Sequence, residues 1–90
     1  MNEPVLVLTD RVKKDYKSLP TSIQKKFKKQ LRFLAADPRH PSLQIHRIRG
    51  SDYWEFYVDI AYRCVFRREG DKFYLLAAGP HKVIDEFARK

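Results

Sequence analysis

The 90-residue sequence contains one cysteine, three glycines and no apolar run that approaches the length of a membrane span. Cys64 has no partner for an internal disulfide, and its neighbours Val65 and Phe66 favour a strand in the core of a protein from a reducing compartment. The start MNEPVLVLTD has acidic Glu3 and too short an apolar run for a signal peptide. We therefore expect a cytoplasmic protein that does not interact with a membrane.

The sequence also lacks a spaced set of metal ligands. Its few histidines are scattered, and His40 and His46 are separated by Pro41 and lie in different expected elements. We expect no metal and no other cofactor. No repeat, linker or low-complexity segment interrupts the chain, and so short a chain closes only one hydrophobic core. Residues 1–90 should therefore form a single domain.

Positive charge is the main compositional feature. Nineteen lysines and arginines face eleven aspartates and glutamates, which leaves a formal net charge of +8. Such a charge on a small domain attracts polyanions, but it does not rank nucleic acid, an acidic protein and an anionic membrane against one another. The 43% of hydrophobic residues is enough for a folded core.

Two helices are expected to follow a first strand. The apolar run Val5 to Leu8 suits a short buried strand, and Asp10 suits the N-cap of a short helix that ends at Pro20. A longer helix, capped by Thr21 or Ser22, then runs to Asp37-Pro38. One face of it is apolar through Ile23, Phe27, Leu31 and Leu34, and the other is basic. The two helices should form a hairpin that packs on a sheet.

Strand signals follow the helices. The expected strands are Leu43–Arg49 with one wet face, Tyr53–Asp59, Tyr62–Arg67 and a central apolar strand Lys72–Ala78, with turns at 50–52, 60–61 and 69–71. The tail from His81 should form a short helix or an ordered end. Side chains alternate in the middle strands, so that Trp54, Phe56, Val58, Tyr62, Cys64 and Phe66 should face the helices.

This order predicts an α+β fold: a twisted, mostly antiparallel sheet of four or five strands with an N-terminal helical hairpin on one face and a short C-terminal helix or tail. The other sheet face is expected to stay open to solvent. It should carry Glu55, Tyr57, Asp59, Arg63 and Arg67.

Three successive segments, HPSLQIHRIRGSDYWEF, AYRCVF and LLAAGPH, resemble landmarks of the RelE/ParE superfamily of type II toxins. The resemblance spans nearly the whole chain and implies a RelE-like fold. It also implies one of two activities, because the RelE branch cuts messenger RNA in the ribosomal A site without a metal, whereas the ParE branch poisons DNA gyrase. A catalytically inactive RNA-binding relative is the third alternative.

Two residues match the positions that the ribonuclease members use. Arg63 stands where they carry a strand arginine, and His81 stands two residues after the glycine that ends the last strand. Some members use a terminal tyrosine, for which this chain has Phe87, and others use a histidine in the region of His46. The chain therefore resembles the histidine-using members.

Metal-free RNA cleavage needs a base for the 2′-hydroxyl, a cation for the phosphate and an acid for the leaving oxygen. His81 is the candidate for proton transfer and Arg63 for stabilising the transition state. Asp59, Glu55 and His46 compete for the second proton-transfer role. The alternative is structural: Arg63 would be a surface arginine paired with Glu55 across the sheet, and His81 a loop residue.

Aromatic and basic residues supply the expected RNA contacts. Tyr57 and Phe87 can stack on unpaired bases. Ionic contacts would come from Arg67, Arg47, Arg49, Lys25, Lys26, Lys28 and Lys29. The resemblance further implies an acidic antitoxin partner, which commonly represses the shared operon through its own DNA-binding part, so that operator DNA is contacted only through the complex.

Overall fold

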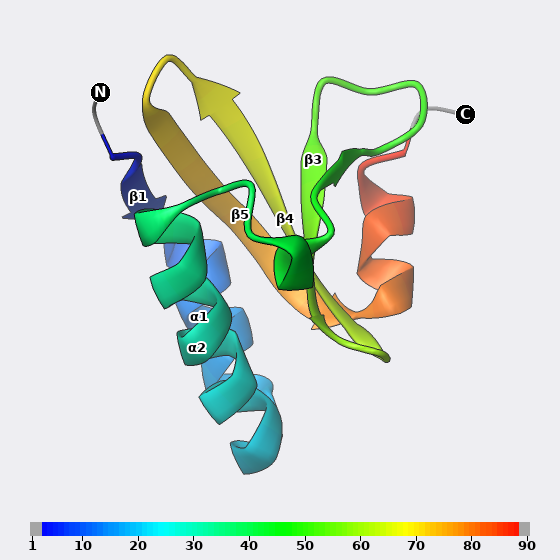
Figure 1. Ribbon diagram of the computed structural model, residues 1–90. Coiled ribbons are helices and arrows are strands. Elements are labelled where there is room, and N and C mark those ends of the chain that lie inside the picture. Colours follow the sequence, from blue (N-terminus) through cyan, green and yellow to red (C-terminus); the bar gives the residue numbers. More distant parts are fainter. Residues whose placement is uncertain (1–2, 89–90) are drawn as a thin grey trace.

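The computed structural model describes residues 3–88 and shows a five-stranded sheet with helices on both sides (Figure 1). The elements are β1 (Val5–Leu8), α1 (Asp10–Ser18), α2 (Thr21–Ala36), η1 (Pro41–Leu43), β2 (His46–Arg47), β3 (Trp54–Asp59), β4 (Tyr62–Glu69), β5 (Lys72–Pro80) and η2 (His81–Glu86). The strand order is β1-β5-β4-β3-β2, and only the β1–β5 pair is parallel. The predicted α+β class and mostly antiparallel sheet are confirmed.

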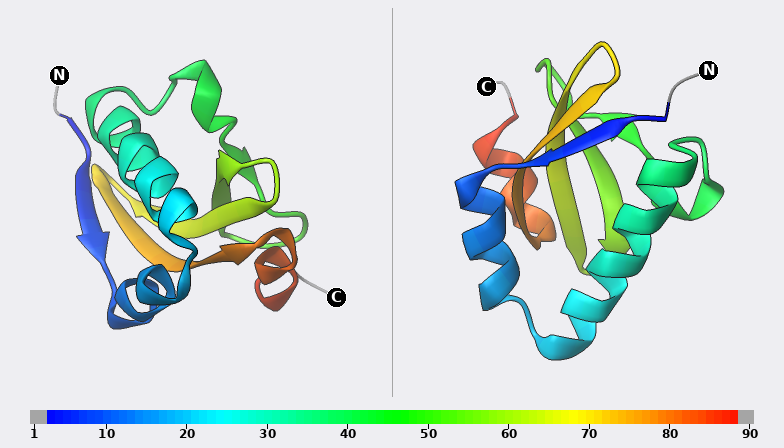
Figure 2. Two further views of the ribbon diagram at one scale, coloured as in Figure 1. Left: turned by 90° about the horizontal axis from the view of Figure 1, so that it is seen from below. Right: turned by 90° about the vertical axis from the view of Figure 1, so that its left-hand side faces the viewer.

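The main core lies between the helical hairpin and the sheet, as the two views in Figure 2 show. Both helices turn their apolar stripes inward, because their apolar residues recur at helical spacing. Phe27 of α2 stacks on Phe56 of β3 at a centroid distance of 6.2 Å, and Phe56 meets Phe66 of β4 at 6.0 Å. Each such side chain contributes about 2–3 kcal/mol when it is fully buried. The predicted inward face of β3 and β4 is confirmed.

A second, smaller core covers part of the opposite sheet face. Val65 of β4 and Ala77 of β5 are fully buried there, beneath Val83 of η2 and Ile48 of the loop before β3. In Figure 1, η2 is the orange segment on the far side of the sheet from the hairpin. The prediction that this face is open to solvent is therefore wrong at this end of the sheet, because the C-terminal segment folds back over it.

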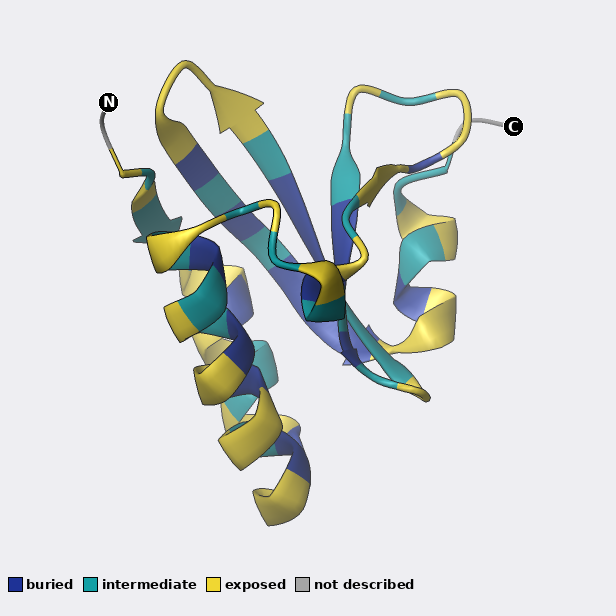
Figure 3. Cartoon of the chain, in the orientation of Figure 1, coloured by how far each residue is buried: buried dark blue, intermediate teal, exposed yellow. Residues whose placement is uncertain are grey.

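The length of one strand and the positions of two others in the sheet also differ from the prediction. β1 is an edge strand rather than a buried one, and Val5 is 47% exposed. The expected strand Leu43–Arg49 is reduced to two residues, because η1 buries Leu43 and Gln44 then adopts a positive φ of 46° that turns the chain. Both residues of β2 are exposed and are coloured yellow in Figure 3. β5 is paired on both sides, but β4 occupies the middle of the sheet.

The helix caps differ from the predicted ones. Thr9, not Asp10, caps α1, because its Oγ1 accepts a hydrogen bond from the Val12 amide. α2 begins directly after Pro20 and has no side-chain cap, so neither Thr21 nor Ser22 performs that role. Within residues 3–88, no helix has both the length and the apolar character that crossing a membrane requires.

Candidate functional site

A histidine, a glutamate and an arginine meet on the sheet face that points away from the hairpin. The antiparallel register places His46 of β2 beside Glu55 of β3, and Arg63 of β4 enters the same face beside Tyr57. Glu55 Oε2 lies 3.1 Å from His46 Nε2, and Glu55 Oε1 lies 3.4 Å from Arg63 Nε. Three neighbouring strands thus bring together three of the five predicted catalytic residues.

Glu55 is the central member of this cluster. Its side chain is only 7% exposed, so its carboxylate has lost most of its water. Oε1 is fully buried and accepts no hydrogen bond within residues 3–88, although Arg63 Nε lies 3.4 Å away. The attraction between Glu55 and Arg63 is therefore a Coulombic contact between two charges in a poorly solvated site, without a well-formed hydrogen bond.

Arg63 is fixed by the turn between β3 and β4. Its Nη1 donates to the carbonyl oxygens of Asp59 at 2.7 Å, Tyr62 at 3.0 Å and Ile60 at 3.3 Å. The guanidinium also lies 4.9 Å from the centre of the Tyr57 ring. Only 16% of the side chain is exposed. The guanidinium is therefore held in one orientation before any ligand arrives.

The hydrogen bonds of His46 determine where its ring carries protons. Nδ1 lies 2.9 Å from the carbonyl oxygen of Gln44, which can only accept, so Nδ1 must donate. Nε2 faces the Glu55 carboxylate, which also accepts. The contact at 3.1 Å is an ion pair when the His46 ring is protonated. The exposed His46 ring therefore stands beside the buried carboxylate, close enough for a proton to pass between them.

His81 stands at the same end of the sheet, as the first residue of η2. Its backbone N–H donates to Ala61 in the β3–β4 turn at 2.8 Å, and Gly79, two residues earlier, pairs with Arg63. The His81 side chain is exposed. Val83 anchors η2 on the second core, and this contact fixes the start of η2 near the carbonyl groups that hold Arg63.

Asp59, in contrast, is directed toward the hairpin. The β3–β4 register shifts between Tyr57 and Asp59, and the Asp59 Oδ2 lies 3.0 Å from Lys26 Nζ of α2. Its Oδ1 accepts from the Ala61 amide at 2.8 Å. The Ala61 hydrogen bond and then Lys26 lower the pKa of Asp59 below its usual value. The carboxylate closes the turn and has no contact with the Glu55 cluster.

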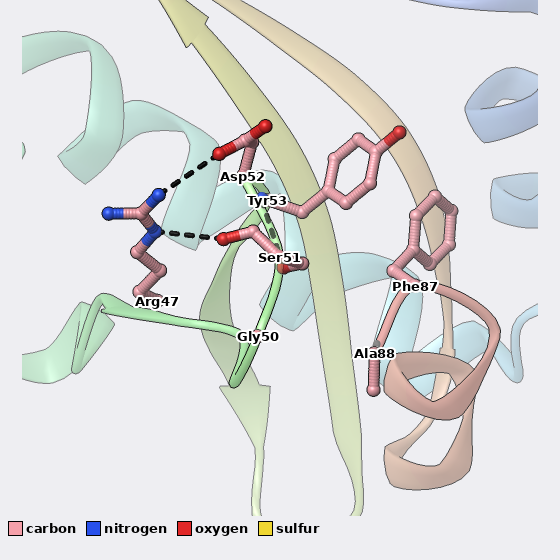
Figure 4. A pocket seen from close by; sticks show the side chains of 7 residues that line it. All are labelled: Arg47, Gly50, Ser51, Asp52, Tyr53, Phe87 and Ala88. Carbon is pink, nitrogen blue, oxygen red and sulfur yellow. Dashed lines mark hydrogen bonds and ion pairs between the residues drawn. The ribbon is translucent and has the colours of Figure 1, made fainter. Parts of the chain in front are cut away.

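Two of the predicted RNA-binding residues line a hollow of about 540 Å³ between the 50–53 loop and the end of η2 (Figure 4). In it, Arg47 donates to the Ser51 carbonyl at 2.9 Å and to Asp52 at 3.1 Å. Phe87 packs edge-on against Tyr53 at 5.1 Å. Phe87 thus packs against the second core, and the Arg47 guanidinium is already hydrogen-bonded within the protein.

The other predicted RNA-binding residues are spread over the molecule. Arg67 lies over the Tyr74 ring at 4.6 Å and pairs with Glu69, and Arg49 is exposed in the turn after β2. The four lysines of α2 are exposed on the helical layer, on the opposite side of the sheet from Glu55. These are Lys25, Lys26, Lys28 and Lys29.

Gln30 is a polar core residue that the sequence analysis missed. It is only 3% exposed, and its amide reaches from α2 to Ser42 of η1 and to Tyr57 of β3. Its position three residues after Phe27 and four before Leu34 places it within the apolar stripe. A polar side chain at such a position is the signal that would have identified it.

No protein-family model and no curated protein matches the chain, but solved structures do. YafQ from E. coli BL21(DE3) superposes with a TM-score of 0.73 at 14% identity, covering 91% of this chain and 98% of YafQ. A double mutant of the E. coli toxin RelE in the free state gives 0.70 at 18% identity, covering 96% and 94%.

The YoeB/ParE toxin from Agrobacterium tumefaciens gives a TM-score of 0.68 at 19% identity, covering 86% of this chain and 98% of the toxin. Because the identities are this low, the structural likeness establishes the fold alone. The RelE-like fold predicted from the three sequence segments is confirmed.

Proposed function

We propose that this chain, which has the fold of the RelE/ParE toxins, is the toxin of a type II toxin–antitoxin system and cleaves messenger RNA on the ribosome without a metal ion. The observation that carries the proposal is the buried Glu55 carboxylate held between the exposed His46 ring and Arg63 on the sheet face away from the hairpin. A proton-exchanging pair beside a fixed guanidinium is the equipment that cleavage by a 2′-hydroxyl requires.

In the proposed reaction the 2′-oxygen attacks the adjacent phosphorus and loses its proton to a base. The bond from phosphorus to the 5′-oxygen breaks, the 5′-oxygen takes a proton from an acid, and a 2′,3′-cyclic phosphate remains. Arg63 would stabilise the negative charge that develops on the phosphate oxygens. His81 and the His46–Glu55 pair would be the two proton-transfer groups, because both stand beside Arg63 or the turn that holds it.

The geometry of the contact between Arg63 and Glu55 favours a catalytic role for the cluster over a purely structural one. A purely structural arginine–glutamate pair gains most from two well-aligned hydrogen bonds, whereas here the Nε contact is 3.4 Å and Oε1 stays without a hydrogen bond. Leaving a buried carboxylate oxygen unsatisfied costs about 1–3 kcal/mol. Such a cost is common where a site must accept a proton or a ligand.

The proposed partners follow from charge and from the related structures. The +8 charge attracts messenger and ribosomal RNA. Structures with the same fold include the DinJ–YafQ toxin–antitoxin complex from E. coli and the RelE–RelB complex from Pyrococcus horikoshii. By analogy, an acidic antitoxin would bind this chain in the cytoplasm and would link it to operator DNA.

The test is cleavage by the purified protein added to ribosomes that translate a defined message. Primer extension should locate cuts within ribosome-bound codons, and the upstream products should carry 2′,3′-cyclic phosphates. Arg63→Ala and His81→Ala should each lower the cleavage rate at least about a hundredfold. Lys14→Ala, an exposed lysine of α1 outside the predicted RNA-binding set, is the control for general changes in charge.

Three results would reject the proposal. A His81→Ala and Arg63→Ala protein that still cuts at the normal rate would remove the mechanism. Intact messages together with DNA breaks and inhibited gyrase would identify a ParE-like toxin. Intact messages, no toxicity and RNA affinity that depends on the lysines alone would identify an RNA-binding relative.

A further inference from the structure

Gln30 makes the most extensive buried polar contact between the hairpin and the sheet. Its Nε2 donates to the Tyr57 carbonyl at 2.6 Å and to the Ser42 carbonyl at 3.0 Å, and its Oε1 accepts from the Ser42 hydroxyl at 3.3 Å. The side chain is 3% exposed. Three hydrogen bonds from one buried amide fix its position, because no water replaces a partner that moves away.

Tyr57 lies beyond the end of β2, where β3 has only β4 as a strand partner. β2 pairs only with Trp54 and Glu55, so β3 continues past its end before it reaches Tyr57. The β3–β4 register then shifts directly after Tyr57. A strand at such a bulge has fewer ladder hydrogen bonds to hold it. The Gln30 amide therefore fixes the backbone at the point where the sheet itself fixes it least.

Tyr57 in turn contacts Arg63. The two residues are direct partners in the β3–β4 register, and the guanidinium lies 4.9 Å from the Tyr57 ring centre. The shift that follows Tyr57 also sets the positions of the Asp59 and Ile60 carbonyls, which accept from Arg63 Nη1. Contacts therefore run without a gap from Gln30 through Tyr57 to both supports of the guanidinium.

We propose that Gln30 is a positioning residue that orients the Arg63 guanidinium through the Tyr57 backbone. This inference rests on the proposed function for its effect on catalysis, but the orientation of Arg63 itself does not depend on that function. Gln30 contacts neither Arg63 nor the sheet face of the cluster, and it acts from the opposite side of the sheet. A substitution of Gln30 in the core should therefore change the orientation of the Arg63 guanidinium and leave Arg63 itself in place.

The test compares Gln30→Met with Leu34→Ala, a buried substitution in the same helix at a side chain that forms no hydrogen bond to Tyr57. Thermal unfolding curves of both proteins identify a temperature at which their folded fractions match. At that temperature, the Arg63 Nε–Hε signal in a proton–nitrogen NMR spectrum should shift and broaden in Gln30→Met and should stay at the wild-type position in Leu34→Ala. Cleavage by Gln30→Met should show a kcat about tenfold lower and a KM within about twofold.

A double-mutant cycle adds a second measurement. If Gln30 acts through Arg63, Gln30→Met should cause no further loss of kcat in an Arg63→Ala background. If Gln30→Met does not fold, Ser42→Ala removes the hydroxyl that donates to Gln30 Oε1 and that also lies 2.9 Å from His40 Nδ1, and it should cause a smaller shift of the same Arg63 signal.

The proposal is overturned if the Arg63 signal of Gln30→Met matches that of Leu34→Ala, or if the two losses of kcat multiply independently. If the wild-type protein leaves the message uncut while the Arg63 signal is still shifted in Gln30→Met, the nuclease function is rejected and the positioning role is kept.

Discussion

Replacing Glu55 with glutamine should abolish activity while leaving stability almost unchanged. The substitution keeps the size of the side chain and removes its charge. In wild type, the Glu55 and Arg63 charges at 3.4 Å attract each other by about 5 kcal/mol at an effective dielectric constant of about 20. Removing the charge loses this attraction. It also removes the desolvation cost of a carboxylate that is 7% exposed, which amounts to several kcal/mol.

The two terms nearly cancel, and Arg63 is not left alone. Its Nη1 keeps three carbonyl acceptors and its guanidinium keeps the Tyr57 ring. We therefore expect the free energy of unfolding to change by about 1 kcal/mol or less. Glutamine cannot exchange a proton with the His46 ring, however, because an amide is not a base. The cleavage rate should fall at least about a hundredfold.

Urea unfolding followed by tryptophan fluorescence, together with single-turnover cleavage of a ribosome-bound message, measures both quantities on the same preparation. Glu69→Gln, an exposed glutamate at the end of β4, is the matched control and should leave both unchanged. A Glu55→Gln protein that is 3–5 kcal/mol less stable would show that the pair is a structural salt bridge. A Glu55→Gln protein with the normal cleavage rate would show that the carboxylate takes no part in catalysis.

Three further predictions concern other parts of the fold. The lowered pKa of Asp59 means that its stabilisation is complete above the unfolded value of about 3.9 and is lost as the pH falls through the lower folded value. Asp59→Asn should therefore cost about 0.5–1 kcal/mol at pH 7 in urea titrations, and a difference that persists at pH 2 would contradict this. Burial raises the pKa of the Cys64 thiol, so a thiol reagent at pH 8 should label the native protein only as fast as it unfolds; rapid labelling would contradict the burial. The ion pair between Arg11 of α1 and Glu86 of η2 is exposed, so Glu86→Gln should speed amide exchange in η2 without changing global unfolding, and equal exchange would show that the pair does not hold η2.

The parts of the fold that follow from side-chain periodicity could be predicted from the sequence. Phe56, Cys64 and Phe66 face the hairpin because strand alternation and helical stripes are local properties. The site was predicted less completely. Glu55 was expected on an open face, yet it is buried, because β2 lies beside it and other segments cover part of that face. These neighbours could not be predicted, because they depend on contacts between distant parts of the chain.

The same distinction explains Asp59 and Gln30. Alternation alone places Asp59 with Glu55, but the register shift after Tyr57 directs its carboxylate to Lys26. A β-bulge inserts one extra residue into one strand of a pair, and the alternation of polar and apolar residues in the sequence does not reveal where it occurs. Gln30 could be located in the apolar stripe of α2, but its partners could not, because Ser42 and Tyr57 reach it only after η1 and the sheet have packed.

The charge of the chain and the charge of the site are different properties. The cluster itself is nearly balanced, since the Glu55 carboxylate offsets Arg63 and leaves only the charge that His46 carries when its ring is protonated. The excess of cations lies elsewhere, including the exposed face of α2 on the other side of the sheet. Long-range attraction to RNA and the chemical step therefore depend on separate residues. Added salt should raise KM through the screened lysines and should leave kcat, which depends on buried and short-range contacts, close to its value at low salt.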